Sequence, residues 1–258
     1  MTHTQRLLCL SGVFLSLLAS TAWGQDTPEN QPPLVKWGLS AGVNRYVESD
    51  IMQLVGPEGG LHSRITHWST MPNTHLEGDI FLGRQNYTSK SSGSINGVTN
   101  LETRWRVMHP LFSDTPTNEG FFAGLALHTL WNDLRGTTYY QGTSYEGYER
   151  MAGQLWLPMR WSSGDMWEID GGLLIYGRHT SMLSQVNSSY QNITNTQRRG
   201  QYAQVAIHVK LDDGDSLKPF VRYTHLADSN TVAMGGKNWI EPESHRWQVG
   251  VVWEFNQR

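Results

Sequence analysis

Apolar residues recur at every second position in many short runs of this 258-residue chain. Successive side chains of a β-strand point to opposite faces of the sheet, so each run predicts a strand with one apolar and one polar face. In the last run the apolar face carries Trp247, Val249, Val251, Trp253 and Phe255, and the other face carries Arg246, Gln248, Gly250, Val252 and Glu254. An apolar face with large aromatic residues at both ends is unusual for a core strand.

The same alternation predicts further strands along the chain. They cover residues 35–43, 61–68, 76–82, 101–107, 120–131, 148–161, 166–178, 200–211 and 217–223. Short links rich in turn-forming residues (70–74, 113–120, 162–165 and 212–216) alternate with longer polar links (48–60, 88–98, 135–147, 180–199 and 230–244). The chain is therefore predicted to be all-β, with about ten antiparallel strands, eight being the alternative.

Two kinds of surroundings fit these strands. A membrane barrel turns its apolar faces outward to lipid and has to close, because hydrocarbon offers no water to an open sheet edge. A soluble lipocalin-like barrel or a periplasmic sandwich would turn the same faces inward. Loops of unequal length at the two ends and aromatic residues at strand ends favour a closed antiparallel transmembrane β-barrel, with short periplasmic turns and longer extracellular loops.

The amino-terminal segment supports export. A basic start at Arg6, a short apolar run and the small residues before Gly24 are typical of a cleaved secretory signal peptide. We expect a signal peptide over 1–24, a short polar segment over 25–33 and a single barrel domain over 34–258. The only cysteine, Cys9, lies inside the predicted signal peptide, so the mature chain gains no stability from disulfides.

Composition excludes some partners. The formal net charge is −3, which is too near neutral for a nucleic-acid-binding protein. An aromatic content of 11% with 26 glycines and 11 tryptophans suits a sheet protein with aromatic bands.

Several segments resemble a group of uncharacterised proteobacterial outer-membrane β-barrel proteins. These are "GYERMAGQLWLPMRW", in which a Tyr-x-Arg enters a strand with a Leu-Pro, "KPFVRYTHLADSN", and "EPESHRWQVGVVWEF" near the end. The chain departs from the usual outer-membrane ending, since Asn256, Gln257 and Arg258 follow the last aromatic residue. The resemblance implies the fold and an outer-membrane location in a Gram-negative bacterium, and it implies no activity.

The alternation assigns side chains to the two faces of the barrel wall. Charged residues expected to fill the narrow lumen are Arg104, Arg106, Arg150, Arg160, Glu168, Asp170, Arg178, Lys210, Arg222 and Arg246. Aromatic residues expected at the lipid interfaces are Trp37, Trp105, Trp131, Trp161, Trp167, Trp247, Trp253 and Phe255. Confined charges are costly unless they pair, so we expect a structural ion-pair network that largely plugs the lumen.

Three functions remain open. A plugged barrel has a structural or surface-interaction role, in which the Tyr-rich loop 137–148 contacts lipopolysaccharide headgroups or a surface ligand. The excess of basic residues in the lumen suggests a narrow, anion-preferring, porin-like pore. His225, Asp228 and Ser229, where a strand meets an outer loop, are candidates for a rim hydrolase acting on lipid A or peptide.

We expect no enzymatic activity, cofactor or metal, because no nucleotide-binding motif, zinc-protease motif or tight His/Asp cluster is present in the sequence. The expected partners are outer-membrane lipid, lipopolysaccharide and the barrel assembly machinery, with no nucleic acid.

Overall fold

The computed structural model describes residues 34–66, 73–112, 119–164, 166–212 and 214–255. The predicted signal peptide (1–24), the polar segment 25–33 and parts of the four predicted short links lie outside these residues. None of the described residues belongs to a helix that is long and apolar enough to cross a membrane.

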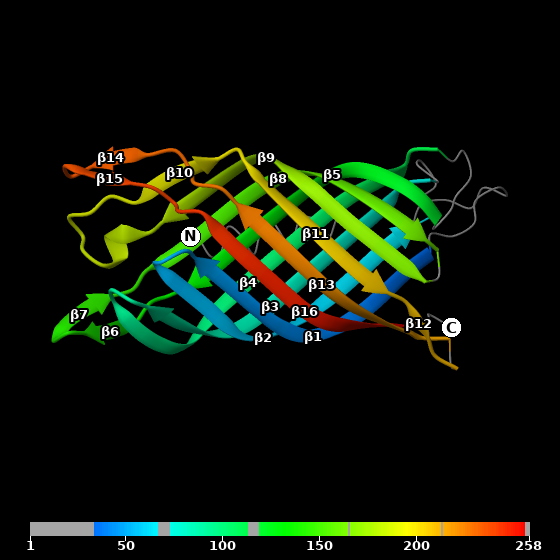
Figure 1. Ribbon diagram of the computed structural model, residues 1–258, viewed down its shortest axis with the longest axis horizontal. Coiled ribbons are helices and arrows are strands. Elements are labelled where there is room, and N and C mark those ends of the chain that lie inside the picture. The colour runs from blue at the N-terminus through cyan, green and yellow to red at the C-terminus, as the bar shows by residue number, and fades with distance from the viewer. Residues whose placement is uncertain (1–33, 67–72, 113–118, 165, 213, 256–258) are drawn as a thin grey trace, which may run out of the picture.

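Ten strands form a closed antiparallel barrel (Figure 1), as the alternation predicts. In ring order they are β1 (Leu34–Glu48), β2 (Met52–Thr66), β3 (His75–Ser89), β4 (Gly93–Pro110), β5 (Glu119–Asp133), β8 (Glu149–Ser163), β9 (Trp167–Ser181), β11 (Gly200–Ile207), β13 (Ser216–Leu226) and β16 (Ser244–Phe255). The last strand closes the ring on the first, in a register that runs from Trp37 opposite Phe255 to Glu48 opposite Ser244. No edge of the barrel wall is left unpaired between these two strands.

Smaller elements extend the two ends of the barrel. At the end remote from the described termini, β6 (Thr137–Tyr140) pairs with β7 (Thr143–Glu146), and β14 (Val232–Met234) pairs with β15 (Lys237–Trp239). At the same end a short 3-10 helix, η1 (Leu183–Gln185), precedes β10 (Ile193–Gln197), which pairs with β9. At the other end β12 (Val209–Lys210) pairs with β13. Figure 1 shows the hairpins gathered at the left, which we call the loop end, and β12 at the right, which we call the terminus end.

The polarity of the wall is inverted relative to a soluble barrel. Large apolar side chains such as Leu82, Leu125 and Val249 are more than half exposed on the outer face, at 58, 54 and 51%. The inner face carries buried charged groups such as Arg104 and Asp170. A lipocalin-like barrel or sandwich would place these two sets the other way round, so the structure favours an apolar medium around the outer face.

Two predicted loops are strands instead. Residues 48–60 and 88–98 belong mostly to β1, β2, β3 and β4, which turn tightly at 49–51 and 90–92. Near these turns the apolar Met52, Leu54 and Val98 form a buried cluster inside the barrel with Leu134. The sequence prediction was wrong here because the strands continue beyond the band in which apolar side chains face outward. In this continuation apolar side chains such as Leu54 face the lumen instead. Longer connections remain at 134–148, 182–199 and 227–243.

Candidate functional site

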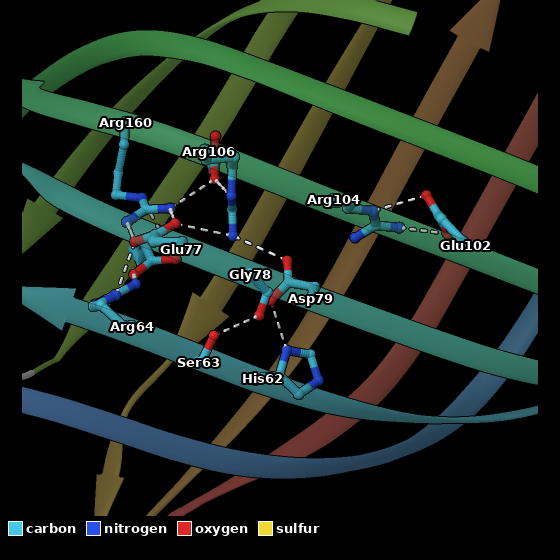
Figure 2. A network of polar contacts seen from close by, with 12 residues as sticks. His62, Ser63, Arg64, Glu77, Gly78, Asp79, Glu102, Arg104, Arg106 and Arg160 are labelled. Atoms are coloured by element: carbon cyan, nitrogen blue, oxygen red, sulfur yellow. Dashed lines mark hydrogen bonds and ion pairs between the residues drawn. The ribbon is translucent and has the colours of Figure 1, made fainter. Parts of the chain in front are cut away.

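Charged side chains fill the terminus-end half of the lumen as a connected network. Its centre is Glu77, whose carboxylate lies 2.8 Å from Arg64 Nε, 3.0 Å from Arg106 Nη2 and 2.7 Å from Arg160 Nη2. Figure 2 shows these three guanidinium groups, from three different strands, arranged around that carboxylate. Asp170 accepts further hydrogen bonds from Arg106 at 2.5 Å and from Arg160 at 3.1 Å. The buried charges in this layer therefore have partners of opposite sign.

Two ion pairs cross the whole lumen. Arg64 on β2 donates to Glu168 on β9 at 2.9 Å. Arg150 on β8 donates to Glu48 on β1 at 2.6 Å. In the ring order, four strands separate β2 from β9 on either side, and four separate β1 from β8. Side chains from opposite walls thus meet at both ends of the lumen, as a plug requires.

The middle of the lumen mixes ion pairs with aromatic rings. Arg104 Nε donates to Glu102 at 2.8 Å and its Nη2 contacts Gln248 of β16, which donates to Glu58 at 2.9 Å. Arg222 is less well paired: its guanidinium carbon lies 3.9 Å from the ring centroid of Tyr202.

The guanidinium group of Arg222 is not fully hydrogen-bonded. Among the described residues, its buried Nε and Nη1 atoms have no hydrogen-bond partner. A cation over an aromatic face is stabilised by the ring quadrupole, which compensates part of that deficit. Arg222 is therefore the buried cation with the most unused donor capacity in this layer.

The loop end closes on a second cluster of charges. Arg150 contacts both Glu48 and Glu241, and His179 Nδ1 lies 2.7 Å from the other carboxylate oxygen of Glu241. Glu241 belongs to the connection between β15 and β16, so this connection folds back over the mouth of the barrel. Burial raises the pKa of Glu241, but Arg150 and His179 lower it more, to about 2.

Above this cluster lies a cavity of about 500 Å³. Its wall combines aromatic and aliphatic side chains with acidic ones, and three of the four charged groups in it are carboxylates. The charged groups are Glu48, Glu146, Glu241 and Arg150, and the apolar and aromatic ones include Ile51, Tyr87, Ile95, Leu134, Tyr145, Tyr148, Ile193, Trp239 and Ile240. Concave, mostly apolar sites with a few convergent polar groups are the usual form of small-molecule sites.

The structure places eight of the ten predicted lumen charges in the buried interior: Arg104, Arg106, Arg150, Arg160, Glu168, Asp170, Arg222 and Arg246. The prediction was wrong for Arg178 and Lys210, which are exposed. In the pairing of β8 with β9, Leu155 faces Tyr176 and Trp156 faces Leu174, so Ile175 is an extra residue. This bulge reverses the faces beyond it, which turns Arg178 outward and His179 inward. Lys210 lies in β12, past the end of β11.

All eight predicted interface aromatics lie on the outer face, and none is fully buried. They are Trp37, Trp105, Trp131, Trp161, Trp167, Trp247, Trp253 and Phe255. Trp37 pairs across strands with Phe255 near the terminus end, whereas Trp247 packs on Tyr223 near the loop end, with ring centroids 4.7 Å apart.

The three candidate hydrolase residues take part in separate contacts. Ser229 Oγ donates to the carbonyl of Asn230 at 2.8 Å and accepts from the backbone N–H of Glu241. Asp228 accepts from the backbone N–H of Glu243, and His225 bonds to the Glu243 carboxylate. No described contact joins His225 to Ser229, so the structure does not assemble a nucleophile and its base here.

His225 instead lies beside His245 and Glu243, two residues that the sequence analysis did not single out. Ligand atoms of these three side chains all lie within 4.8 Å of one another. His225 and His245 have the same face parity in their strands, but only the register of β13 with β16 makes them neighbours. The signal in the sequence was the pair of histidines at the loop-end termini of two predicted strands.

No protein-family model matches the sequence, and a search of curated proteins gave no match. Several solved structures are similar in fold. They include the translocator domain of the autotransporter NalP from Neisseria meningitidis, at 13% identity, TM-score 0.47 and coverage of 98% of this chain and 97% of that one. The β domain of the Bordetella autotransporter BrkA is 11% identical, with a TM-score of 0.49 and coverage of 86% of this chain and 98% of that one. The outer-membrane protease OmpT from Escherichia coli is 10% identical, with a TM-score of 0.42 and coverage of 91% of this chain and 100% of that one. All three TM-scores are below 0.5, so these matches decide nothing about this chain, and its function has to be argued from the site.

Proposed function

We propose that this protein is a bacterial outer-membrane β-barrel that binds a small amphipathic molecule at its outer mouth and does not act as an open pore. The observation that carries the proposal is the cavity of about 500 Å³ above a lumen bridged by ion pairs from opposite walls. The apolar outer face supports the membrane location, with lipopolysaccharide around the loop end and the assembly machinery as a partner during insertion.

The lining of the cavity suggests the class of ligand. Aromatic and aliphatic side chains offer an apolar wall, while Glu48, Glu146 and Glu241 outnumber the single Arg150. Arg150 is already engaged by Glu48 and Glu241, so spare negative charge faces the cavity. A ligand with an apolar body and an ammonium or other donor-rich head fits this chemistry.

The binding test uses a dansyl-labelled long-chain alkylamine and the purified full-length barrel in detergent. Tyr145 lines the cavity, whereas Tyr139 in the same hairpin is 74% exposed and does not. We expect Tyr145→Ser to weaken binding about tenfold or more, since an aromatic side chain that a ligand covers is commonly worth that much, and Tyr145 is 40% exposed without one. Tyr139→Ser should bind as the parent does. Equal binding by both variants, or none by the parent, would overturn the assignment of the mouth as the site.

The plugged lumen has its own test. Folded protein in a planar bilayer is expected to give no regular current steps, because paired side chains fill the path. A narrow anion-preferring pore is the second candidate, and the incompletely paired Arg222 favours it. Chloride-selective steps that disappear in Arg222→Met would support that candidate and contradict the plug.

A hydrolase at the rim gains no support from the contacts of Ser229 and His225, which point to different partners. An assay with lipid A or peptide remains the direct test. Activity that is lost in both His225→Ala and Ser229→Ala would reverse our view that the protein is not an enzyme.

A further inference from the structure

Two histidines face each other on neighbouring strands at the loop-end rim. His225 of β13 is paired directly with His245 of β16, and their rings are stacked with centroids 5.1 Å apart and an interplanar angle of 19°. Directly opposed residues of an antiparallel pair bring their Cβ atoms to about 5 Å. Both side chains lie on the outer face of the wall, next to the Tyr223–Trp247 pair.

A carboxylate completes the cluster. Glu243, just before β16, places its Oε1 2.6 Å from His225 Nε2 and 3.8 Å from His245 Nε2. Both ring nitrogens therefore converge on one carboxylate oxygen. Local movement of these side chains would let a small cation bind between the three groups at ordinary metal–ligand distances of about 2.0–2.2 Å.

Neighbouring groups hold the donors in place. The Tyr223 hydroxyl is 2.7 Å from His245 Nδ1, which leaves Nε2 of that ring directed at Glu243. The backbone N–H of Glu243 donates to Asp228 at 2.6 Å, which fixes the segment that carries the carboxylate. A hydrogen bond to the second ring nitrogen is the usual way in which proteins orient a metal-binding imidazole.

We propose that His225, Glu243 and His245 form a binding site for a divalent transition-metal ion, with Zn²⁺ as the expected occupant. Two neutral imidazoles and one carboxylate suit Zn²⁺, whereas Mg²⁺ and Ca²⁺ prefer oxygen ligands throughout. The side chains of the three residues are between 24 and 48% exposed, so an ion reaches them from outside without entering the lumen. A fourth position stays open to water.

The place of the site in the fold suggests its effect. The metal would join both strands to the 227–243 connection, and the same connection carries Glu241 over the barrel mouth. Occupancy would therefore hold the cover of the cavity in the position seen here. The metal site does not depend on the identity of the cavity ligand, so either proposal can fail alone.

The experiment is isothermal titration of Zn²⁺ into the full-length barrel, folded in detergent and free of any polyhistidine tag. We expect one Zn²⁺ per chain and no comparable binding of Mg²⁺. His225→Ala and His245→Ala should each weaken the Zn²⁺ affinity by about tenfold or more, and Tyr223→Phe should weaken it while all three ligands remain.

The matched control is His109→Ala, because His109 is also an exposed strand histidine but lies on β4, away from the cluster. It should bind Zn²⁺ as the parent does. Heat-modifiability on a gel shows that each variant is folded before titration. X-ray absorption of the loaded parent should report imidazole ligands. Parent-like Zn²⁺ affinity in folded His225→Ala and His245→Ala, or no Zn²⁺ binding by the parent, would overturn the proposal.

Discussion

The two ends of the lumen solve the problem of buried charge in different ways. At the terminus end, Glu77 is surrounded by three arginines and its side chain is 2% exposed. At the loop end, Arg150 and His179 share Glu241 beneath a cavity that opens to the outside. The first cluster is built wholly from barrel strands, whereas the second depends on the connection that carries Glu241.

This difference makes the terminus-end cluster rigid and leaves the loop-end cluster able to open. A carboxylate fixed by three guanidinium groups from different strands ties those strands together and blocks the lumen. A cluster completed by a connection can open when that connection moves, without disturbing the wall. We therefore expect the terminus end to make the larger contribution to stability and the loop end to determine binding.

Removal of the central carboxylate is expected to have the largest effect. Glu77→Ala leaves Arg64, Arg106 and Arg160 with fewer partners in a buried space, which should destabilise the fold by about 3–5 kcal/mol. Urea unfolding in detergent, followed by heat-modifiability, measures it. Glu146→Ala in the β6–β7 hairpin is the control, since that carboxylate is exposed. Equal stability of the two variants would erase the distinction between the two ends.

Acidification is expected to have the next largest effect, and Glu241 is the carboxylate through which it acts on the loop end. The pKa of Glu241 lies at about 2, below the ordinary value of 4.5. A lowered pKa means that the ionised carboxylate stabilises the native state above pH 4.5 and that this contribution fades as the pH falls toward 2.

The control for this pH effect is Glu241→Gln, because other buried carboxylates also titrate. The difference in unfolding free energy between the parent and this variant should shrink between pH 5 and pH 2, while the difference at neutral pH stays constant. A difference that does not change with pH would show that the folded-back connection does not depend on the charge of Glu241.

The sequence predicts the barrel wall far better than it predicts the site. Alternation assigned Arg104, Arg106 and Arg160 to the inside because a strand has a fixed period. It assigned Arg178 wrongly because one extra residue at Ile175 reverses the faces, and nothing in the local composition marks that bulge. Periodicity is a local property, so an irregular register becomes visible only when the partner strand is known.

The same limit explains what was missed at the mouth. Glu241 lies in a polar connection without periodicity, and its contacts with Arg150 and His179 join residues far apart in the chain. The His225, Glu243 and His245 cluster likewise depends on strand register. Side chains of this kind are brought together by tertiary structure, which a single sequence does not encode in a readable spacing.

Arg222 tests whether the middle of the lumen behaves like the terminus end. Replacement by methionine removes a buried cation with two unpartnered nitrogens, but it also removes the contact with the Tyr202 ring. Removal of the unpaired buried cation stabilises the fold, whereas loss of the contact with the Tyr202 ring destabilises it. Arg222→Met should therefore change the unfolding free energy by less than about 1 kcal/mol. A loss similar to that of Glu77→Ala would place Arg222 in the structural network. Urea unfolding in the same detergent compares them directly.

The smallest effect is expected at an exposed ion pair of the loop end. Arg135 Nη2 lies 2.7 Å from Asp133, a distance as short as the contacts around Glu77, yet the Arg135 side chain is 54% exposed. Water screens such a pair and the long side chain loses entropy on pairing, so Arg135→Ala should cost less than about 0.5 kcal/mol. The two ion pairs have similar contact distances, and their different burial predicts very different contributions to the unfolding free energy. If Arg135→Ala instead approached the cost of Glu77→Ala under the same unfolding conditions, then contact distance rather than burial would govern the energetics of both ends.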